Sequence, residues 1–189
     1  MKKKIFAVAL AACLVVLSVV SGTVAYFTDH ETASHTFTSG NVAINLTFSN
    51  NDNTVNTIYP GQVLKYAATV KSTGTETSYT GIIVTIDREL SEADVNALFG
   101  AFDANYTVNY IAGTDKTTVR IAYNNILAKD GSVTFFDDIT IPTTWGNDEM
   151  SAFSGVTFTV DAYAIQSAGF TSAVVALAAA TEFNGAWAN

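Results

Sequence analysis

The sequence contains little cysteine and few basic residues, and both shortages exclude classes of protein. Its one cysteine, Cys13, lies near the N-terminus, so the chain beyond it has no thiol to form a disulfide, bind a metal or act as a nucleophile. Nine Lys and Arg stand against 17 Asp and Glu, which gives a formal net charge of −8. A chain this acidic, with no basic run after residues 2–4, is not expected to bind nucleic acid or anionic lipid.

Sequence motifs of several enzyme classes are also missing. There is no Gly-x-Ser-x-Gly motif and no glycine-rich phosphate-binding loop. The two tryptophans, Trp145 and Trp187, are few for a surface that stacks against sugars. The paired carboxylates of a glycoside hydrolase have no fixed spacing in a sequence, so that class stays open at this point.

The first 25 residues have the layout of a secretory signal peptide. Residues 2–4 are lysines, residues 5–20 are apolar except for Ser18, and small residues precede the end at Ala25. This layout predicts export and cleavage between Ala25 and Tyr26 by a signal peptidase. The apolar run is shorter than the ~20 residues that a membrane span needs, so we expect no membrane attachment after cleavage.

Cys13 offers a different interpretation of this leader, because Leu10-Ala11-Ala12-Cys13 resembles the cleavage box of a lipoprotein. The apolar run continues past Cys13 as far as Val20, whereas a lipoprotein box lies at the end of such a run. We therefore favour cleavage after Ala25. The remaining residues 26–189 keep six basic against 17 acidic residues, a net charge of −11, and their number suits one domain with its own core.

Apolar and polar residues alternate along much of the chain that follows the leader. Because successive side chains of a strand point to opposite faces, this alternation indicates strands with one face buried. Strands are expected at 42–48, 82–86, 106–110, 119–123 and 156–164, with further strands at 63–71 and 132–141. Turn-forming residues separate these segments, at 59–61, 72–74, 112–115, 129–131 and 145–148.

Two segments have helical features instead. Ser91 and Asp94 have the spacing of a capping box, and apolar residues then recur at intervals of three and four from Val95 to Phe102. An Ala-rich helical turn is expected at 172–181. The sequence therefore predicts an all-β fold, an antiparallel, jelly-roll-like β-sandwich over residues 39–189 with a short helical insertion and an N-terminal extended arm.

Residues 26–38, the expected arm, fit the domain least well. They are polar, rich in threonine and β-prone, but they alternate poorly and contain no turn signal before Ser39. We expect this arm to be a candidate donor strand, in which aromatic residues anchor the segment and the backbone between them pairs with another sheet. The arm residues singled out for this role are Tyr26, Phe27, Thr28, Thr32, Thr36 and Phe37.

Both histidines lie in the arm and invite comparison with a zinc-protease motif. In His-Glu-x-x-His the two imidazoles are four residues apart and share one helix face, so that they meet one Zn²⁺. Here His30 and His35 are five residues apart, with Glu31 between them. That spacing rotates the second imidazole about 140° around a helix or places it on the opposite face of a strand. We therefore expect no metal site and no catalytic residues here, with His30, Glu31 and His35 kept as a weak alternative.

Three groups of acidic residues are candidate ligands for Ca²⁺, which binds carboxylate oxygens. None has the spacing of a calcium-binding loop, and acidic loops on an acidic domain are usually solvated. We expect no cofactor, with calcium as the open exception. The groups are Asp137-Asp138, Asp148-Glu149, and Asp87 with Glu89, Glu92 and Asp94.

The leader and the arm together resemble the start of the TasA/camelysin family of exported bacterial proteins. The likeness rests on Ser21-Gly22-Thr23-Val24-Ala25-Tyr26-Phe27-Thr28-Asp29, followed by Thr36-Phe37-Thr38-Ser39-Gly40-Asn41-Val42. Two weaker matches are Ile58-Tyr59-Pro60-Gly61-Gln62, a Pro-Gly turn before a strand, and the late strand at 161–170.

The resemblance implies a jelly-roll domain, a leader cut by a SipW-type signal peptidase, and secretion to the matrix or surface of a Gram-positive bacterium. It also implies a structural role, as a subunit of biofilm-matrix fibres in which the arm of one copy completes the sheet of the next. The partners would be further copies of the same chain and other matrix proteins.

Two other functions remain open on the sequence. Camelysin is classed as a cell-surface metalloprotease, but this chain lacks a competent zinc motif, so we expect a non-enzyme. Alternatively, the arm folds back onto its own sheet, and the chain is a monomeric matrix accessory protein or adhesin.

Overall fold

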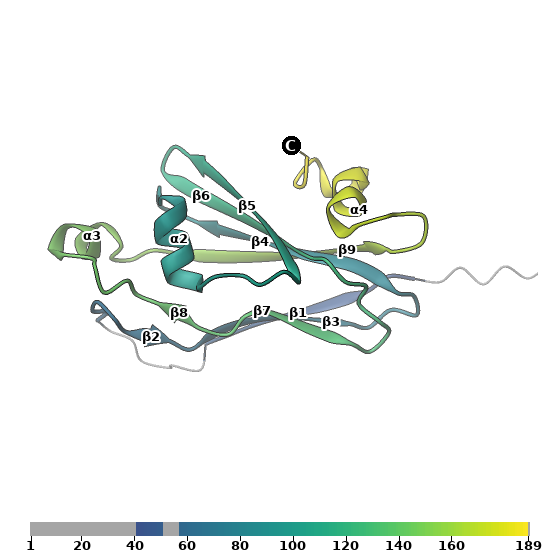
Figure 1. Cartoon of the computed structure of the whole chain (residues 1–189), viewed down its shortest axis with the longest axis horizontal. Coiled ribbons are helices and arrows are strands. Elements are labelled where there is room, and N and C mark those ends of the chain that lie inside the picture. Colours follow the sequence, from purple (N-terminus) through teal and green to yellow (C-terminus); the bar gives the residue numbers. More distant parts are fainter. Residues whose placement is uncertain (1–40, 51–56, 189) are drawn as a thin grey trace, which may run out of the picture. The chain divides into compact units, whose positions relative to one another are not determined.

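The computed structural model describes residues 41–50 and 57–188, which fold into two antiparallel β-sheets with short helices at their margins (Figure 1). All of them belong to the compact unit that runs from Ser39 to Asn189. The expected arm, at residues 26–38, lies outside the described residues. No helix among the described residues is long and apolar enough to cross a membrane.

The first sheet has three strands in the spatial order β1 (Ile44–Asn50), β3 (Tyr66–Ser72) and β7 (Ser132–Phe136). Just beyond it along the chain, the two-residue strands β2 (Val63–Leu64) and β8 (Ile139–Thr140) pair with each other. The second sheet has the order β5 (Tyr106–Gly113), β6 (Lys116–Tyr123), β4 (Ser78–Ile86) and β9 (Phe158–Gln166). The prediction of an all-β, antiparallel sandwich is confirmed.

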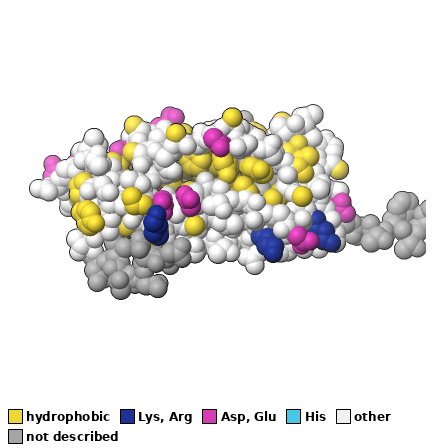
Figure 2. Space-filling view, turned by 60° about the horizontal axis from the view of Figure 1, so that its bottom comes forward, with side chains coloured by type: hydrophobic (Ala, Val, Ile, Leu, Met, Phe, Trp, Pro, Cys, Tyr) yellow, Lys and Arg dark blue, Asp and Glu magenta, His cyan; other side chains and the backbone are white. Residues whose placement is uncertain are grey.

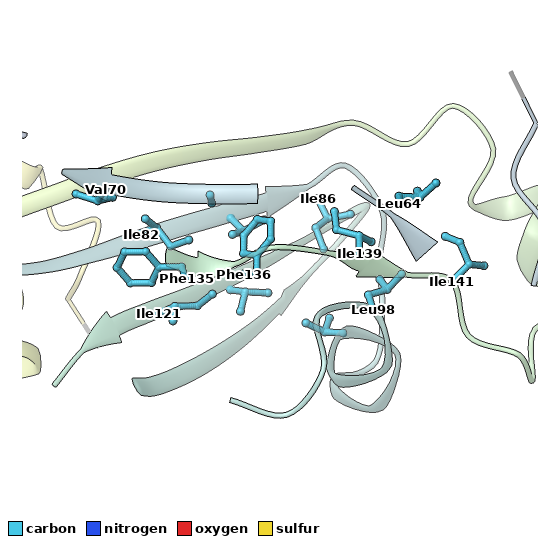
Figure 3. Close-up of a cluster of buried hydrophobic side chains, with 14 of the residues drawn as sticks. Leu64, Val70, Ile82, Ile86, Leu98, Ile121, Phe135, Phe136, Ile139 and Ile141 are labelled. Carbon is cyan, nitrogen blue, oxygen red and sulfur yellow. The ribbon is translucent and has the colours of Figure 1, made fainter. Parts of the chain in front are cut away.

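The core lies between the two sheets, because the inward side chains of both are apolar. Val70 of the first sheet and Ile82, Val84 and Ile121 of the second have no exposed surface. Figure 3 shows side chains of these strands near Phe135 and Phe136 of β7, with the cluster continuing past Leu98 toward Ile141 at one end. Every strand predicted from alternation is present, and the 63–71 and 132–141 segments are each broken into two short strands.

Three short α-helices and a 3₁₀ helix, η1 (Thr181–Phe183), accompany the sheets in the described part of the chain. The helix α2 (Glu92–Phe99) begins as predicted at Ser91, whose hydroxyl accepts the backbone N–H of Asp94 at 3.1 Å. The Ala-rich helix α4 (Ala173–Ala179) also forms as predicted, capped by Ser172.

The predicted turn at 145–148 is wrong in its second half. Residues Asn147 and Asp148 begin a third helix, α3 (Asn147–Ala152). Gly146 precedes this helix, and its backbone N–H donates to Oε2 of Glu149 at 2.9 Å. A carboxylate in the first turn therefore satisfies a backbone donor that a helix leaves unpaired, and the turn-forming residues serve to start the helix.

A second apolar cluster covers the outer face of the β4–β6–β9 sheet. Ala176 and Leu177 of α4 pack there with Tyr79 and Ile83 of β4, and Trp187 lies against the same face. This cluster explains why β4 is buried on both faces, since all but one of its nine residues are buried.

Candidate functional site: an open side and an end cleft of the β-sandwich

The residues that the sequence singled out for processing, metal binding and polymerisation all lie outside the described residues. Their roles therefore stay predictions. They are Ala25 and Tyr26 at the cleavage site, His30, Glu31 and His35 of the weak metal alternative, and Phe27, Thr28, Thr32, Thr36 and Phe37 of the arm.

The acidic group around α2 is engaged in structural hydrogen bonds. Oδ2 of Asp94 accepts the Ser91 hydroxyl at 2.6 Å, and its Oδ1 accepts the indole N–H of Trp145 at 3.0 Å. The hydrogen bond from the Ser91 side chain is the main reason that the pKa of Asp94 lies below its usual value of 3.8. Oδ1 of Asp87 accepts the backbone N–H of Thr157 at 2.9 Å, and this bond likewise lowers the pKa of Asp87.

The other two acidic groups are also partly engaged. Asp138 forms an ion pair with Lys65 at 2.8 Å, and Glu149 caps α3 through Gly146. Within residues 41–50 and 57–188, no three His, Cys, Asp or Glu side chains come together to hold a metal ion. The carboxylates of Asp87, Asp94, Asp138 and Glu149 thus serve structural roles, and the calcium expectation stays a prediction.

Neither tryptophan is available as a platform for sugars. Trp145 is 7% exposed and packs edge-on against Phe153, with ring centroids 4.8 Å apart. Trp187 is 6% exposed and packs against Tyr163. The sequence could not settle this, because exposure depends on which elements cover the rings.

One side of the sandwich, between strands β5 and β7, is closed by side chains. The hydroxyl of Tyr106 on β5 donates to the backbone carbonyl of Thr134 on β7 at 2.7 Å and so bridges the two sheets. The ring of Tyr106 also packs on Phe135, at 5.7 Å between centroids, and burial raises its pKa, which keeps the phenol a donor. An edge carbonyl of β7 is thereby occupied, which disfavours addition of a strand here.

We call the opposite side, between β1 and β9, the open side, because both are edge strands that could each accept a further strand. These two strands are in contact although they belong to different sheets, and within the described residues neither pairs with a strand on its outer edge. Their inward side chains are only half-buried, in contrast to those of the central strands. On β1 they are Ile44 and Leu46, and on β9 they are Phe158, Val160 and Ala162.

A cleft of about 820 Å³ opens at one end of this side. Phe48 and Tyr66 line it on the first sheet, Phe158 lines it at the start of β9, and Phe153 lines it just after α3. No Asp, Glu, Lys or Arg side chain lines the cleft among the described residues. Its volume is in the range that binds small molecules or peptide side chains. Figure 2 shows one face of the molecule, on which hydrophobic side chains form a band and the charged side chains are scattered.

The described chain begins, at Asn41, at the end of the sandwich opposite β2 and α3, which border the cleft (Figure 1). The backbone N–H of Asn41 donates to Oγ1 of Thr75 at 3.0 Å, and the carbonyl of Ala43 accepts the backbone N–H groups of Thr73 and Gly74. In the antiparallel register Ile44 pairs with Ser72, whereas Phe48, at the cleft, pairs with Ala68. The direction of β1 therefore separates the point where the chain enters from the cleft.

A comparison with protein families identifies the group to which this fold belongs. The model of the camelysin metallo-endopeptidase family matches residues 1–159, most of the chain. The chain belongs to the camelysin family. The resemblance found in the leader and the arm is thus confirmed at the level of the family, and no curated protein matches the chain.

The name of the camelysin family implies a metal, and the described residues do not fit one. Four of their carboxylates, those of Asp87, Asp94, Asp138 and Glu149, are already bound to other groups of the domain. No three potential metal ligands come together among the described residues. The histidines of this camelysin-family chain are both outside the described residues. We therefore derive no catalytic step through a metal.

Sequence analysis did not predict the cleft or the Tyr106 bridge. The cleft is assembled from the strands β1, β2, β3, β8 and β9 together with α3 and the residues that follow it, which are far apart in the sequence. Its one sequence signal is that the alternating pattern of β1 ends on Phe48, a large side chain that is 37% exposed. An aromatic residue at the end of an edge strand is consistent with a binding surface, but it does not locate one.

Proposed function

We propose that the mature chain is a secreted structural subunit that polymerises head to tail through residues 26–38 into extracellular fibres. The observation that carries this proposal is the placement of the open β1–β9 side and its cleft opposite the point where the chain enters at Asn41. A donor segment at one end and an acceptor surface at the other form a heterologous contact, which produces filaments when it does not close into a ring.

The open side suits the addition of a strand. An edge strand has unpaired backbone N–H and C=O groups, and an added strand would satisfy them while covering the half-buried side chains of Leu46 and Val160. The arm supplies a threonine-rich, β-prone segment with few charges for this pairing. On the other side, the Tyr106 hydroxyl already donates to an edge carbonyl of β7, so the side between β1 and β9 suits the arm better.

The charge of the domain favours end-to-end over lateral association. Residues 26–189 carry a net charge of −11, and like charges on the remaining surface oppose side-by-side packing. Export by a signal peptidase, release from the membrane after cleavage and location in a bacterial matrix belong to this same proposal. Its partners are further copies of the chain and, in a matrix, other matrix proteins.

The test is a deletion of residues 26–38 from the chain that begins at Tyr26. We expect the complete chain to form fibres visible by electron microscopy and the deleted chain to remain monomeric with unchanged circular dichroism. Fibres of the deleted chain would contradict the proposal. A complete chain that stays monomeric at every concentration in size-exclusion chromatography would favour the accessory-protein alternative, in which the arm pairs with its own sheet.

The family name favours a second candidate, a cell-surface metalloprotease. This function would have to use His30, Glu31 and His35, because the described residues contain no group that could hold the metal. It predicts proteolysis by the purified chain that a chelator abolishes and that a His30→Ala variant lacks. If fibres form in the presence of the chelator and the purified chain shows no such proteolysis, the structural role is supported and the enzymatic role is contradicted.

A further inference from the structure

We infer that the cleft beside Phe48 binds the Phe37 side chain of a second copy of this chain. The inference rests on the proposed function and goes further, because it names one acceptor site and one anchoring residue. It also distinguishes pairing with a neighbour from pairing within one subunit, which the sequence left open.

The length of the chain before Asn41 limits how far Phe37 can reach. Asn41 is held at the Thr75 end of the domain, and Phe37 is four residues before it, so Phe37 can lie at most about 14 Å from Asn41. Phe48 is seven residues after Asn41 along an extended strand, about 23 Å away. Even a chain that turns straight back therefore leaves the Cα of Phe37 about 9 Å short of the Cα of Phe48, which is only the near rim of the cleft. A Phe37 ring seated deep in the cleft is thus favoured to come from another copy.

Phe27 is a poorer candidate for this role. Phe27 lies 14 residues before Asn41, and a segment of that length can span up to about 48 Å. Phe27 can therefore reach the cleft of its own subunit. A side chain that occupies the cleft of its own subunit does not drive polymerisation. A side chain that falls short of that cleft leaves it free to bind a neighbour. The geometry thus favours Phe37 as the intersubunit anchor.

The lining of the cleft and the segment around Phe37 are chemically complementary. The cleft is lined by aromatic rings and by small hydroxyl side chains such as Ser151 and Ser154, with no charged side chain among the described residues. The segment from Thr36 to Asn41 is also uncharged, and threonines flank its one aromatic ring. By contrast, Asp29 lies two residues after Phe27, and burying a carboxylate in an apolar cleft is costly.

The aromatic rings that line the cleft form two pairs that suit contact with a further ring. Phe48 and Tyr66 have centroids 5.9 Å apart, and Phe153 and Phe158 have centroids 6.0 Å apart. Both pairs line the cleft, so a phenyl ring placed between them can make the tilted or edge-on contacts that aromatic rings prefer. Phe48 and Val63, which are 37% and 43% exposed, provide apolar surface at this end of the domain.

The first experiment is disulfide trapping in assembled fibres. The chain from Tyr26 onward has no cysteine, so a Thr38→Cys, Ser151→Cys double variant keeps Phe37 and contains only the two test thiols. We expect oxidation of its fibres to give covalent dimers and longer ladders on a non-reducing gel, because a disulfide needs Cβ atoms within about 4.5 Å. A Thr36→Cys, Ser154→Cys pair tests the same contact if the first variant does not assemble.

The matched control is Thr38→Cys with Lys116→Cys. Lys116 begins β6 at the same end of the sandwich, since the neighbouring Thr117 pairs with Ile86, but it does not line the cleft. We expect no ladder from this pair. Fibres that form without a ladder from the Ser151 and Ser154 pairs, or with an equal ladder from the Lys116 pair, would overturn the inference while leaving the fibre function intact. A complete chain that never forms fibres would overturn both.

The second experiment measures the critical concentration for fibre formation. We expect Phe37→Ala to raise it by about tenfold or more, as for a hot-spot aromatic residue, and Phe37→Leu to restore part of the loss. Phe27→Ala is the matched variant and should change it by less than about threefold. The reverse order of the two alanine variants would overturn the assignment to Phe37.

Discussion

Gly74 lies so close to Asn41 that a methyl group added at Gly74 would be 2.5 Å from the carbonyl oxygen of Asn41. The same methyl group would be 2.6 Å from the backbone nitrogen of Ala43. The Asn41 carbonyl accepts the backbone N–H of Thr75, and the Ala43 carbonyl accepts that of Gly74 itself, so neither residue can move aside without breaking the contacts that fix the start of β1. The absence of a side chain at Gly74 is therefore what permits the chain to enter the domain here.

Gly74→Ala is expected to lower the free energy of unfolding by about 1–3 kcal/mol, the usual cost of inserting a methyl group where none fits. Urea unfolding followed by circular dichroism measures this change. Gly113→Ala is the matched control, because its methyl group would meet only Lys116 at an ordinary 3.5 Å. Equal effects of the two substitutions would contradict the close approach of Gly74 and Asn41.

The Tyr106 hydroxyl bridge should be measurable as a local effect at the edge of β7. Tyr106→Phe removes the donor to the Thr134 carbonyl and is expected to cost about 1 kcal/mol of stability. Amide hydrogen exchange should become faster in β5 and β7 but not in β1. Tyr59→Phe, at a tyrosine that is 61% exposed, should change stability by less than about 0.5 kcal/mol. Unchanged exchange in β7 would show that this side is not closed by Tyr106.

The sequence predicted the strands well because their signal is local. Alternation from Val156 to Ala164 and the capping pair Ser91–Asp94 depend on neighbouring residues, and both formed as expected. The one misjudged turn, at 145–148, combines residues that favour a turn with those that start a helix, and Glu149 decides between the two. Local pattern thus indicated the elements but not each of their boundaries.

The candidate site was less predictable, since it depends on how the sheets meet. Whether Tyr106 or Leu46 faces a closed or an open side is decided by the order β5-β6-β4-β9 and by the contact of β1 with β9. No pattern within either strand reports this order. The acidic residues around α2 show the same limit, because Asp94 is bound to Trp145, 51 residues further along the chain.

Asp94 should make the stability of the domain sensitive to acid. Its pKa in the folded state is lowered from 3.8, first by the hydrogen bond with the Ser91 side chain, so folding favours the charged carboxylate. The stability that it contributes is therefore present above pH 3.8 and is lost as the pH falls below that value, through the lowered pKa. Asp94→Asn should reduce stability most at neutral pH, and the two proteins should converge in acid.

Urea unfolding at a series of pH values tests this dependence. Asp161→Asn, at an exposed carboxylate of β9, serves as the matched control and should shift stability by less than about 0.5 kcal/mol at every pH. A constant difference between the wild-type chain and Asp94→Asn from pH 7 down to pH 2.5 would mean that the charge of Asp94 does not stabilise the fold.

Trp187 and Gly81 should be energetically coupled, because the indole ring occupies the space above a residue without a side chain. A methyl group at Gly81 would lie 2.6 Å from Cη2 of Trp187 and 2.9 Å from the carbonyl oxygen of Ile121. Trp187→Ala is expected to cost about 3–5 kcal/mol, as for other buried large aromatic residues, and to expose the apolar outer face around Ile83.

In a double-mutant cycle, Gly81→Ala should be less destabilising in the Trp187→Ala background than in the wild-type chain. Removal of the indole ring takes away the two closest contacts of the added methyl group and leaves the contact with the Ile121 carbonyl. Stabilities from urea unfolding of the four proteins give the coupling energy, expected at about 1–3 kcal/mol. Additive effects would mean that the fit of Trp187 over Gly81 contributes nothing to the stability of the fold.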